Sequence, residues 1–325
     1  MMKILIGHDG SQSADAALVD LQRAGLPDDA EALIVSVADV ITVPVTSDYE
    51  FAAEALMSRR VTAGLVHAER QRERVLSEAK HFADRARDRV RSYFPHWNVR
   101  AETLAGPAAS ELISKANEWR PDLIVVGSHG RSAVGRFLLG SVSKKVVTDS
   151  DHTVRVSRGN VERDLNKPPR LVIGVDGSSE AEQAIRTVGS RVWPYGTEVR
   201  LVTVDDRISP QRIAHILPTA AEMIGSSNER AARNAEQMAQ WAADELSAIG
   251  LEVSISLKKG DARRVLIDQA KFWNADSIFV GGRRFNNALE RFQLGSVATA
   301  LVTKAHCSVE VVRNSASDEL SRGEF

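Results

Sequence analysis

A short apolar stretch that ends in a glycine turn decides the fold of this chain. It reads Leu123-Ile124-Val125-Val126-Gly127-Ser128-His129-Gly130, and Gly140-Ser141 follows after nine further residues. A run of aliphatic residues bounded by glycine is typical of a buried parallel strand. The spacing leaves one tight turn, an excursion, and a second glycine turn that opens a helix at Ser141. Glycine N–H groups between a strand end and a helix start form a concave anion site, so the stretch predicts a phosphate-binding loop in an α/β fold.

This loop lacks the cation that phosphoryl-transfer sites use. Gly135 and Gly140 have the spacing of a Walker A motif, but Ser141 and Val142 follow where that motif has lysine and Ser/Thr. Such a lysine normally cradles the phosphates of the reacting nucleotide. We therefore expect nucleotide binding rather than efficient catalysis.

Composition indicates an ordinary two-domain protein. The 325 residues suffice for two domains, and the single cysteine, Cys307, excludes a disulfide framework or a cysteine metal site. A formal net charge of −1 argues against a dedicated nucleic-acid or membrane-surface binder. The N-terminal apolar stretch is too short for a signal peptide, and no apolar run reaches transmembrane length. We expect a cytoplasmic protein with neither nucleic-acid nor membrane partners.

The chain contains one unit twice. Residues 3–11 reappear as 171–178, and Asp9 and Asp176 lie 167 positions apart. Gly140-Ser141 and Gly295-Ser296 are offset by only 155, so the first copy carries twelve extra residues. The interval 40–65 is the place for them, and we expect a loop or short helix over the site.

Each copy alternates strands with helices. In the first copy we expect strands near 3–7, 32–38, 98–104, 122–126 and 153–157, and helices near 13–24, 66–93, 108–119 and 141–150. In the second copy we expect helices near 179–191, 227–249, 262–273 and 296–305. Ser11 or Ser13 could cap the first helix, Ser178 or Ser179 its counterpart, and Pro107 suits the first turn of the third helix. This alternation predicts parallel sheets covered on both faces, with ligands at the carboxyl ends of the strands.

The repeat also sets the expected domain boundaries. The first domain is expected over residues 1–159 and the second over 170–314. Between them, residues 160–169 form a polar linker that ends in Pro168-Pro169. A small, charged, disordered tail is expected over 315–325.

The motifs resemble those of a known family. Gly127-x2-Gly130-x9-Gly140-Ser141, with Asp9 at the end of the first strand, is similar to the ATP-binding type of the universal stress protein family, and the resemblance covers both copies. It implies two flavodoxin-like or Rossmann-like domains of the adenine nucleotide alpha hydrolase type. Each would have a five-stranded parallel sheet of order 3-2-1-4-5. The domains would pair through their last strands, near 153–157 and 308–312, so that one chain imitates the family's dimer; a further homodimer stays open.

The resemblance places the candidate ATP site in the first copy. Its residues are Gly7, Asp9, Val37, Gly127, His129, Gly130, Arg131, Gly140, Ser141 and Val142. Adenine would lie against the Val37 backbone, and a Mg²⁺ ion carried by ATP would lie near Asp9. Asp9 could instead be a turn residue that satisfies local N–H groups, and His129 and Arg131 could contact phosphate or ribose or be solvated. No catalytic triad and no histidine spacing for a metal is present, so we assign no catalytic residue and no metal held by the protein alone.

The second copy departs from this pattern. Its corresponding residues are Asp176, Val204, Gly282, Arg283, Arg284, Gly295 and Ser296. If Gly281 is aligned with Gly127, Arg284 replaces the second glycine of the loop; if Gly282 is aligned instead, Phe285 replaces it. Either way a side chain stands where backbone should approach phosphate. We expect this degenerate site to bind nucleotide poorly, although its two adjacent arginines could attract phosphate.

The expected function is that of an ATP-binding universal stress protein with a stress-response or regulatory role. Its nucleotide would be bound mainly in the first domain, and its occupancy would be read by a protein partner that the sequence does not name. Two alternatives stay open: a nucleotide-independent interaction scaffold with an inherited loop, and a slow ATP hydrolase.

Overall fold

The structure is a computed structural model of the chain. It describes residues 1–39, 59–130, 139–158, 164, 166–205, 218–282 and 294–313. Three candidate site residues, Arg131, Arg283 and Arg284, lie outside the described residues, as do Phe285 and the expected tail.

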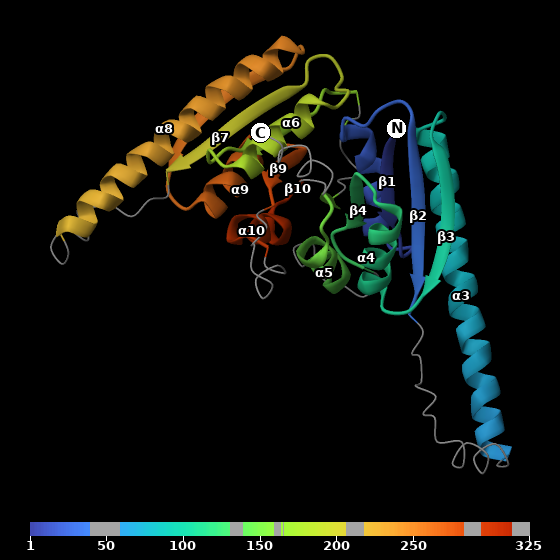
Figure 1. Cartoon of the computed structure of the whole chain (residues 1–325). Coiled ribbons are helices and arrows are strands. Elements are labelled where there is room, and N and C mark those ends of the chain that lie inside the picture. The colour runs from blue at the N-terminus through green and yellow to red at the C-terminus, as the bar shows by residue number, and fades with distance from the viewer. Residues whose placement is uncertain are drawn as a thin grey trace, which may run out of the picture.

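The first repeat alternates strands and helices as predicted (Figure 1). Its elements are β1 (Met2–Gly7), α1 (Gln12–Asp20), the 3-10 turn η1 (Leu21–Arg23), β2 (Ala30–Ala38), α3 (Arg59–Tyr93), β3 (Asn98–Ala105), α4 (Ala108–Trp119), β4 (Leu123–Gly127), α5 (Ser141–Asp149) and β5 (Val154–Ser157). The second repeat has β6 (Arg170–Gly174), α6 (Ser179–Gly189), β7 (Glu198–Asp205), α8 (Pro218–Ala248), β8 (Glu252–Lys259), α9 (Ala262–Phe272), β9 (Ser277–Gly281), α10 (Ser296–Lys304) and β10 (Ser308–Val312).

Several helix boundaries differ from the sequence-based expectations. Helix α3 begins at Arg59 and α8 at Pro218, each earlier than expected. After these first residues no proline interrupts either helix. Residues 59–65 therefore belong to α3 and do not form a separate loop or short helix, and residues 40–58 lie outside the described residues. Helix α1 ends at Asp20, earlier than expected, and η1 follows it.

The helix caps resolve the alternatives left by the sequence. Ser11 caps α1 by accepting the N–H of Ala14, and Ser178 caps α6 in the same way. Pro107 stands at the N-cap of α4, one residue before the first turn where we expected it, with φ −67° and ψ 112°. An extended ψ at this place is the ordinary N-cap conformation.

The strands form one sheet of ten, in the order β3-β2-β1-β4-β5-β10-β9-β6-β7-β8 (Figure 1). Each repeat therefore has the predicted order 3-2-1-4-5, and its own five strands are parallel. The two halves meet where β5 and β10 pair antiparallel, with Arg155 opposite Glu310. The predicted pairing through the last strands is confirmed. We call this junction the β5–β10 seam.

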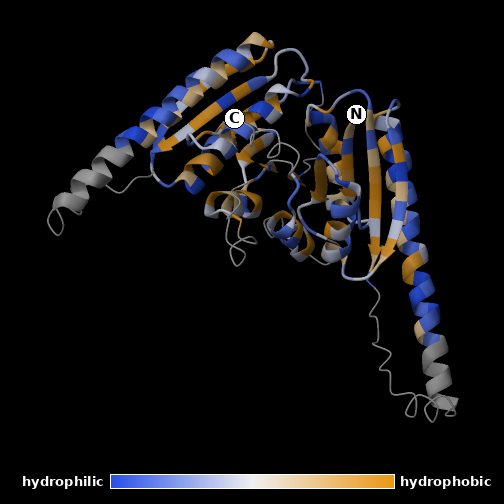
Figure 2. Ribbon diagram, in the orientation of Figure 1, coloured by the Kyte–Doolittle hydropathy of each residue, from blue (hydrophilic) through white to orange (hydrophobic). Residues whose placement is uncertain are grey.

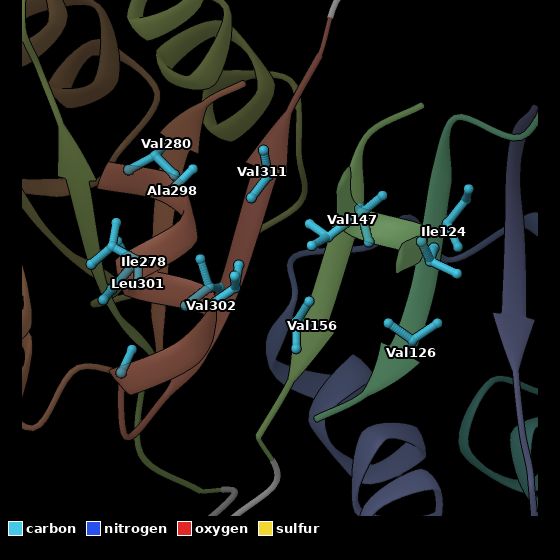
Figure 3. Close-up of a cluster of buried hydrophobic side chains, with 14 of the residues drawn as sticks. Ile124, Val126, Val147, Val156, Ile278, Val280, Ala298, Leu301, Val302 and Val311 are labelled. Carbon is cyan, nitrogen blue, oxygen red and sulfur yellow. The ribbon is translucent and has the colours of Figure 1, made fainter. Parts of the chain in front are cut away.

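Helices cover both faces of the sheet. Helices α1 and α3 pack on one face of the first repeat, and α6 and α8 pack on the matching face of the second. The other face carries α4, α5, α9 and α10, whose apolar side chains form one cluster with both repeats. Figure 3 shows this cluster on both sides of the seam, with Val147 and Val156 from the first repeat and Val302 and Val311 from the second. The core is therefore continuous through the junction.

The long helices α3 and α8 lie on the sheet through matching rows of small residues. In α3 the buried row is Ala79, Ala83, Ala86 and Val90, and in α8 it is Ala235, Ala239, Ala242 and Leu246. Both rows follow the spacing i, i+4, i+7, i+11, which keeps them on one helix face. The rest of the described surface of α3 is largely hydrophilic (Figure 2). The N-terminal part of α3 extends beyond the carboxyl ends of β2 and β3 (Figure 1).

Candidate functional site

The two glycine turns of the first repeat meet at the carboxyl edge of the sheet. The Gly140 N–H donates to the Ser128 carbonyl at 2.8 Å. A Cβ added to Gly140 would lie 3.2 Å from the His129 Cα and 3.5 Å from the Gly130 nitrogen. The turn after β4 and the start of α5 are thus packed backbone to backbone, and a Cβ at position 140 would require a shift of a few tenths of an ångström.

Asp9 lies beside the same glycines. A Cβ added to Gly130 would lie 3.0 Å from the Asp9 Oδ2. The other carboxylate oxygen, Oδ1, accepts the N–H of Ser11 at 3.0 Å, and Gly10 between them has φ +78°. Asp9 therefore closes a turn with one oxygen and faces the glycine loop with the other. The structural and the functional interpretations of Asp9 are compatible.

Two of the candidate glycines are packing positions. A Cβ added to Gly127 would meet the Ser13 side chain at 2.9 Å and the Ser13 backbone at 3.0 Å. A Cβ added to Gly7 would lie 3.0 Å from a methyl group of Leu112. Gly127 lets α1 approach β4, and Gly7 does the same for α4 and β1. Neither carries the close approach at the loop that Gly130 and Gly140 make.

Serine hydroxyls tie the loop to its helices, and sequence reasoning missed them. Ser143 Oγ donates to the Gly127 carbonyl at 2.6 Å, and the His129 N–H donates to Ser13 Oγ at 3.3 Å. Ser128 Oγ lies 2.9 Å from His129 Nδ1 and 3.3 Å from Ser13 Oγ. The signal was a serine in the first turn of each helix that faces the strand end. These bonds fix the His129 ring through Ser128, so His129 belongs to the loop framework.

The remaining candidates surround the same edge. Gly140 is the N-cap of α5, with φ −63° and ψ 152° and no hydrogen bond from a described side chain to the cap. The first N–H groups of a helix have no intrahelical partner, and Ser141, which carries one of them, is exposed. Val142 is half-buried. Val37 is half-buried near the carboxyl end of β2, two residues beyond the position paired with Gly7.

A buried histidine supports the Asp9 turn from below. His8 is 3% exposed, its Nδ1 accepts the Gly10 N–H at 3.3 Å, and its Nε2 lies 3.2 Å from Asp15 Oδ1. Arg85 and Arg89 of α3 hold the same Asp15 carboxylate at 3.0 Å each. Burial lowers the pKa of His8, although the neighbouring Asp15 opposes this. The neutral ring, with its proton on Nε2, satisfies both contacts at once.

Among the described residues, the second repeat shows no counterpart of the packed loop contact. Gly281 takes the place of Gly127, because its added Cβ would meet Glu180 of α6 at 2.4 Å, as Gly127 meets Ser13 of α1. This favours the first of the two possible alignments. Gly282 instead continues the pairing of β9 with β10, because its N–H donates to the Val312 carbonyl at 2.7 Å. A Cβ added to Gly295 would meet no described atom within 4 Å.

The other residues of the degenerate site keep only local roles. Asp176 is exposed and its Oδ1 accepts both the N–H and the hydroxyl of Ser178, at 3.0 and 2.5 Å. Val204 is half-buried in β7, and Ser296 is exposed at the start of α10. The described part of this edge therefore keeps the turn and the helix start without the loop contact.

Fold and site together define a tandem α/β protein with two Rossmann-like units, one of which keeps a glycine loop packed on a helix start. The sequence model of the Universal stress protein family matches residues 1–158 and 169–313. The chain therefore belongs to that family, and it carries the family's unit twice.

Individual relatives agree with this assignment. A universal stress protein of Mycolicibacterium smegmatis is 24% identical over 310 residues, 95% of this chain and 96% of the relative. A universal stress protein of Methanocaldococcus jannaschii is 27% identical over 159 residues, 47% of this chain and 80% of the relative. The crystal structure of a universal stress protein from Archaeoglobus fulgidus has a TM-score of 0.56 at 18% identity and covers 96% of this chain and 98% of its own. That likeness supports the fold.

Among the described residues, no helix is both long and apolar enough to cross a membrane. Within the same residues, no group of three or more His, Cys, Asp or Glu side chains could hold a metal ion.

Proposed function

We propose that the first repeat binds ATP and that occupancy of this site has a regulatory role. The observation that carries the proposal is the meeting of three backbone segments at one sheet edge: the Asp9 turn, Gly130, and Gly140 at the start of α5. Backbone N–H groups of a glycine loop and a helix N-terminus suit phosphate, because they supply donors and a favourable dipole without bulk. The carboxyl edge of a doubly wound sheet is also where ligands bind in this fold class.

In the proposed orientation, the phosphates lie against Gly130, Gly140, Ser141 and Val142. His129 and Arg131 are the side chains proposed to contact phosphate or ribose. Adenine lies against the Val37 backbone. Any Mg²⁺ is held by the phosphates with Asp9 as its protein partner, since a single carboxylate oxygen is a poor site without the nucleotide.

A matched pair of variants tests the site. Gly140 and Gly295 are N-caps of corresponding helices with nearly the same backbone angles. Aspartate is a good N-cap residue, so Gly140→Asp keeps a capped helix but places a negative charge on the phosphate donors. We expect ATP affinity in titration calorimetry to fall about a hundred-fold, equivalent to one or two charge-assisted hydrogen bonds. Gly295→Asp should leave affinity unchanged.

A neutral variant separates charge from bulk. Gly140→Asn has nearly the shape of aspartate and should weaken binding less than Gly140→Asp. Equal ATP affinity in wild type and Gly140→Asp would contradict the proposed site. Absence of nucleotide binding in the wild type would favour the scaffold alternative.

Slow turnover is the second candidate. Positioning and charge stabilisation supply most of phosphoryl-transfer catalysis, and the described loop offers backbone donors without a lysine. We expect bound ATP to remain largely intact. Hydrolysis above about 1 s⁻¹, the low end of typical turnover, that vanishes in Gly140→Asp would instead establish an ATPase.

A further inference from the structure

Each repeat contributes one arginine, Arg158 or Arg313, that donates hydrogen bonds to the other repeat across the β5–β10 seam. Arg158 follows β5, and its Nη2 donates to the carbonyls of Val302 and Thr303 at 2.9 and 2.8 Å. These carbonyls lie in the last turn of α10 in the second repeat. Arg158 is therefore a C-terminal cap supplied by the first repeat to a helix of the second.

Arg313 does the reverse. It follows β10, and its Nη2 donates to the Val147 carbonyl at 2.6 Å while Nη1 donates to the His152 carbonyl at 3.3 Å. Val147 lies in the last turns of α5 in the first repeat. The side chain is nearly buried, with 8% exposure. Arg313 thus holds the far end of the helix whose near end is the proposed phosphate site.

A hydroxyl group of the opposite repeat accepts the backbone N–H of each arginine. The Arg313 N–H donates to Thr153 Oγ1 at 3.1 Å, and the Arg158 N–H donates to Ser308 Oγ at 3.0 Å. Arg313 is also packed against the second repeat, since a Cβ added to Gly282 would lie 3.0 Å from its Cγ and 3.2 Å from its Nε. Arg313 therefore connects the start of the second repeat's loop with the end of α5.

Helix α5 is short enough to act as a rigid connection between the Arg313 contact at its C-terminal end and Gly140 at its N-terminal end. Helix α5 has nine residues, which corresponds to a rod of about 13 Å. Its last carbonyls have no intrahelical partners, and a guanidinium is a favourable partner for them because it complements the helix dipole. Moving or releasing that end moves Gly140 and Ser141 at the other.

We propose that Arg313 is a positioning residue for the nucleotide site of the first repeat and that it makes this site depend on the second repeat. The proposal rests on the proposed ATP site. Arg313 touches α5 at the end opposite to the phosphate, so it acts through the helix and not on the ligand. Arg158 does the same for α10, whose start belongs to the degenerate loop, and is therefore a control built into the chain.

The test uses the full chain with Arg313→Met and Arg158→Met. Both variants remove one cross-seam cap and leave the glycine loop unchanged. We expect the ATP dissociation constant of Arg313→Met to rise about five-fold or more, the low end of coupling between distinct sites. That of Arg158→Met should stay within about two-fold, as expected for a substitution with no shared partners. Equal values in both variants, whether raised or unchanged, would overturn the proposal.

A second measurement keeps the proposal testable if a methionine variant fails to fold. Arg313→Lys and Arg158→Lys keep the charge but not the fork of donors. Without nucleotide, amide exchange at Lys144, whose N–H donates to the Gly140 carbonyl at 2.9 Å, should be faster in Arg313→Lys than in wild type, and unchanged in Arg158→Lys. Unchanged exchange in Arg313→Lys would overturn the proposal even if ATP is bound. Because this readout needs no nucleotide, it separates failure of the positioning role from failure of the ATP site.

Discussion

Glycine has three different physical roles within the first repeat. Gly127 is required by close packing, because any Cβ there would meet the backbone of Ser13. Gly10 is required by its positive φ, which side-chain-bearing residues adopt at a cost. Gly140 and Gly130 are favoured by close approach within the loop, to the His129 backbone and to the Asp9 carboxylate respectively. The spacing of these glycines in the sequence predicts a loop, but only the contacts distinguish which of them leave room for a ligand.

His8 should make stability depend on pH. The folded state holds the His8 pKa below its ordinary value of 6.5, through burial that outweighs Asp15. The unfolded chain therefore binds a proton more readily than the folded chain below that pH, and the free energy of unfolding should fall as pH falls. Stability from this group is fully present above the ordinary pKa and is lost as pH drops through the folded-state pKa.

The variant His8→Asn isolates this contribution. Its amide oxygen can accept the Gly10 N–H in place of Nδ1, and it does not titrate. Urea unfolding at about pH 7.5 and about pH 5.5 brackets the ordinary histidine pKa. Wild type should lose more stability than His8→Asn over this interval. Equal losses would show that His8 is not responsible, and His152, whose pKa burial also lowers, would be the next group to replace.

At the scale of elements, each of the two long helices packs on the sheet through three alanines, with a larger aliphatic residue, Val90 or Leu246, at the end of the row. The rows in α3 and α8 have the same spacing and lie on the matching face of each repeat. Small residues let a helix lie close to a sheet, so added volume has nowhere to go. The close approach also explains Gly10 and Gly177, whose added Cβ atoms would meet Phe82 of α3 and Ala235 of α8.

Enlarging one alanine should therefore be costly only inside the row. Ala83 is 1% exposed, and Ala83→Leu should destabilise the chain by about 1–3 kcal/mol, as overpacking usually does. Ala68 lies on the same helix and is exposed, so Ala68→Leu should change stability by no more than about 0.5 kcal/mol. Denaturant unfolding followed by circular dichroism compares the two. Similar costs would show that α3 is not packed through this row.

How far the sequence predicts these elements depends on the kind of signal. Apolar strands that end in glycine gave the strand order through the resemblance, and the offsets of 167 and 155 revealed the repeat. The helical segment before residue 66 was missed because it contains Val61, Thr62 and Gly64, which have low helix propensity. Arg155, Arg158 and Arg313 were not identified because their partners lie more than 100 residues away across the seam. A charged residue in a strand looks exposed until its neighbouring strand is known.

At the scale of the whole molecule, buried charges distinguish the two sides of the seam. Arg155 and Glu310 are both fully buried, and their side chains approach to 3.3 Å. Asp20 of the first repeat also pairs with Arg155, and Arg191 of the second pairs with Glu310. Burial alone would lower the pKa of Arg155, but Asp20 and Glu310 hold it above its ordinary value. Pairing two first repeats would instead bring two arginines together, so the charges favour the unlike pair.

Breaking this network should be strongly destabilising. Arg155→Met keeps much of the side-chain volume but leaves Asp20 without its cation. We expect a loss of about 3–5 kcal/mol, the usual cost of removing one member of a buried ion pair. The surface control is Arg233→Met, which removes an exposed ion pair with Glu229 and should cost at most about 1 kcal/mol. A small effect at Arg155 would mean that water solvates the seam.

The seam joins two strands of the same chain, so their association does not depend on the concentration of the protein. In an assembly of separate subunits, dilution shifts the equilibrium toward free partners. Here each β5 meets its β10 at an effective concentration set by the tether, whatever the concentration of the protein. Hydrogen exchange at the seam amides of Val309 and Val311 should therefore be the same over roughly a hundred-fold dilution. A chain of this design keeps its two units paired even at concentrations at which a weak dimer of separate units would dissociate.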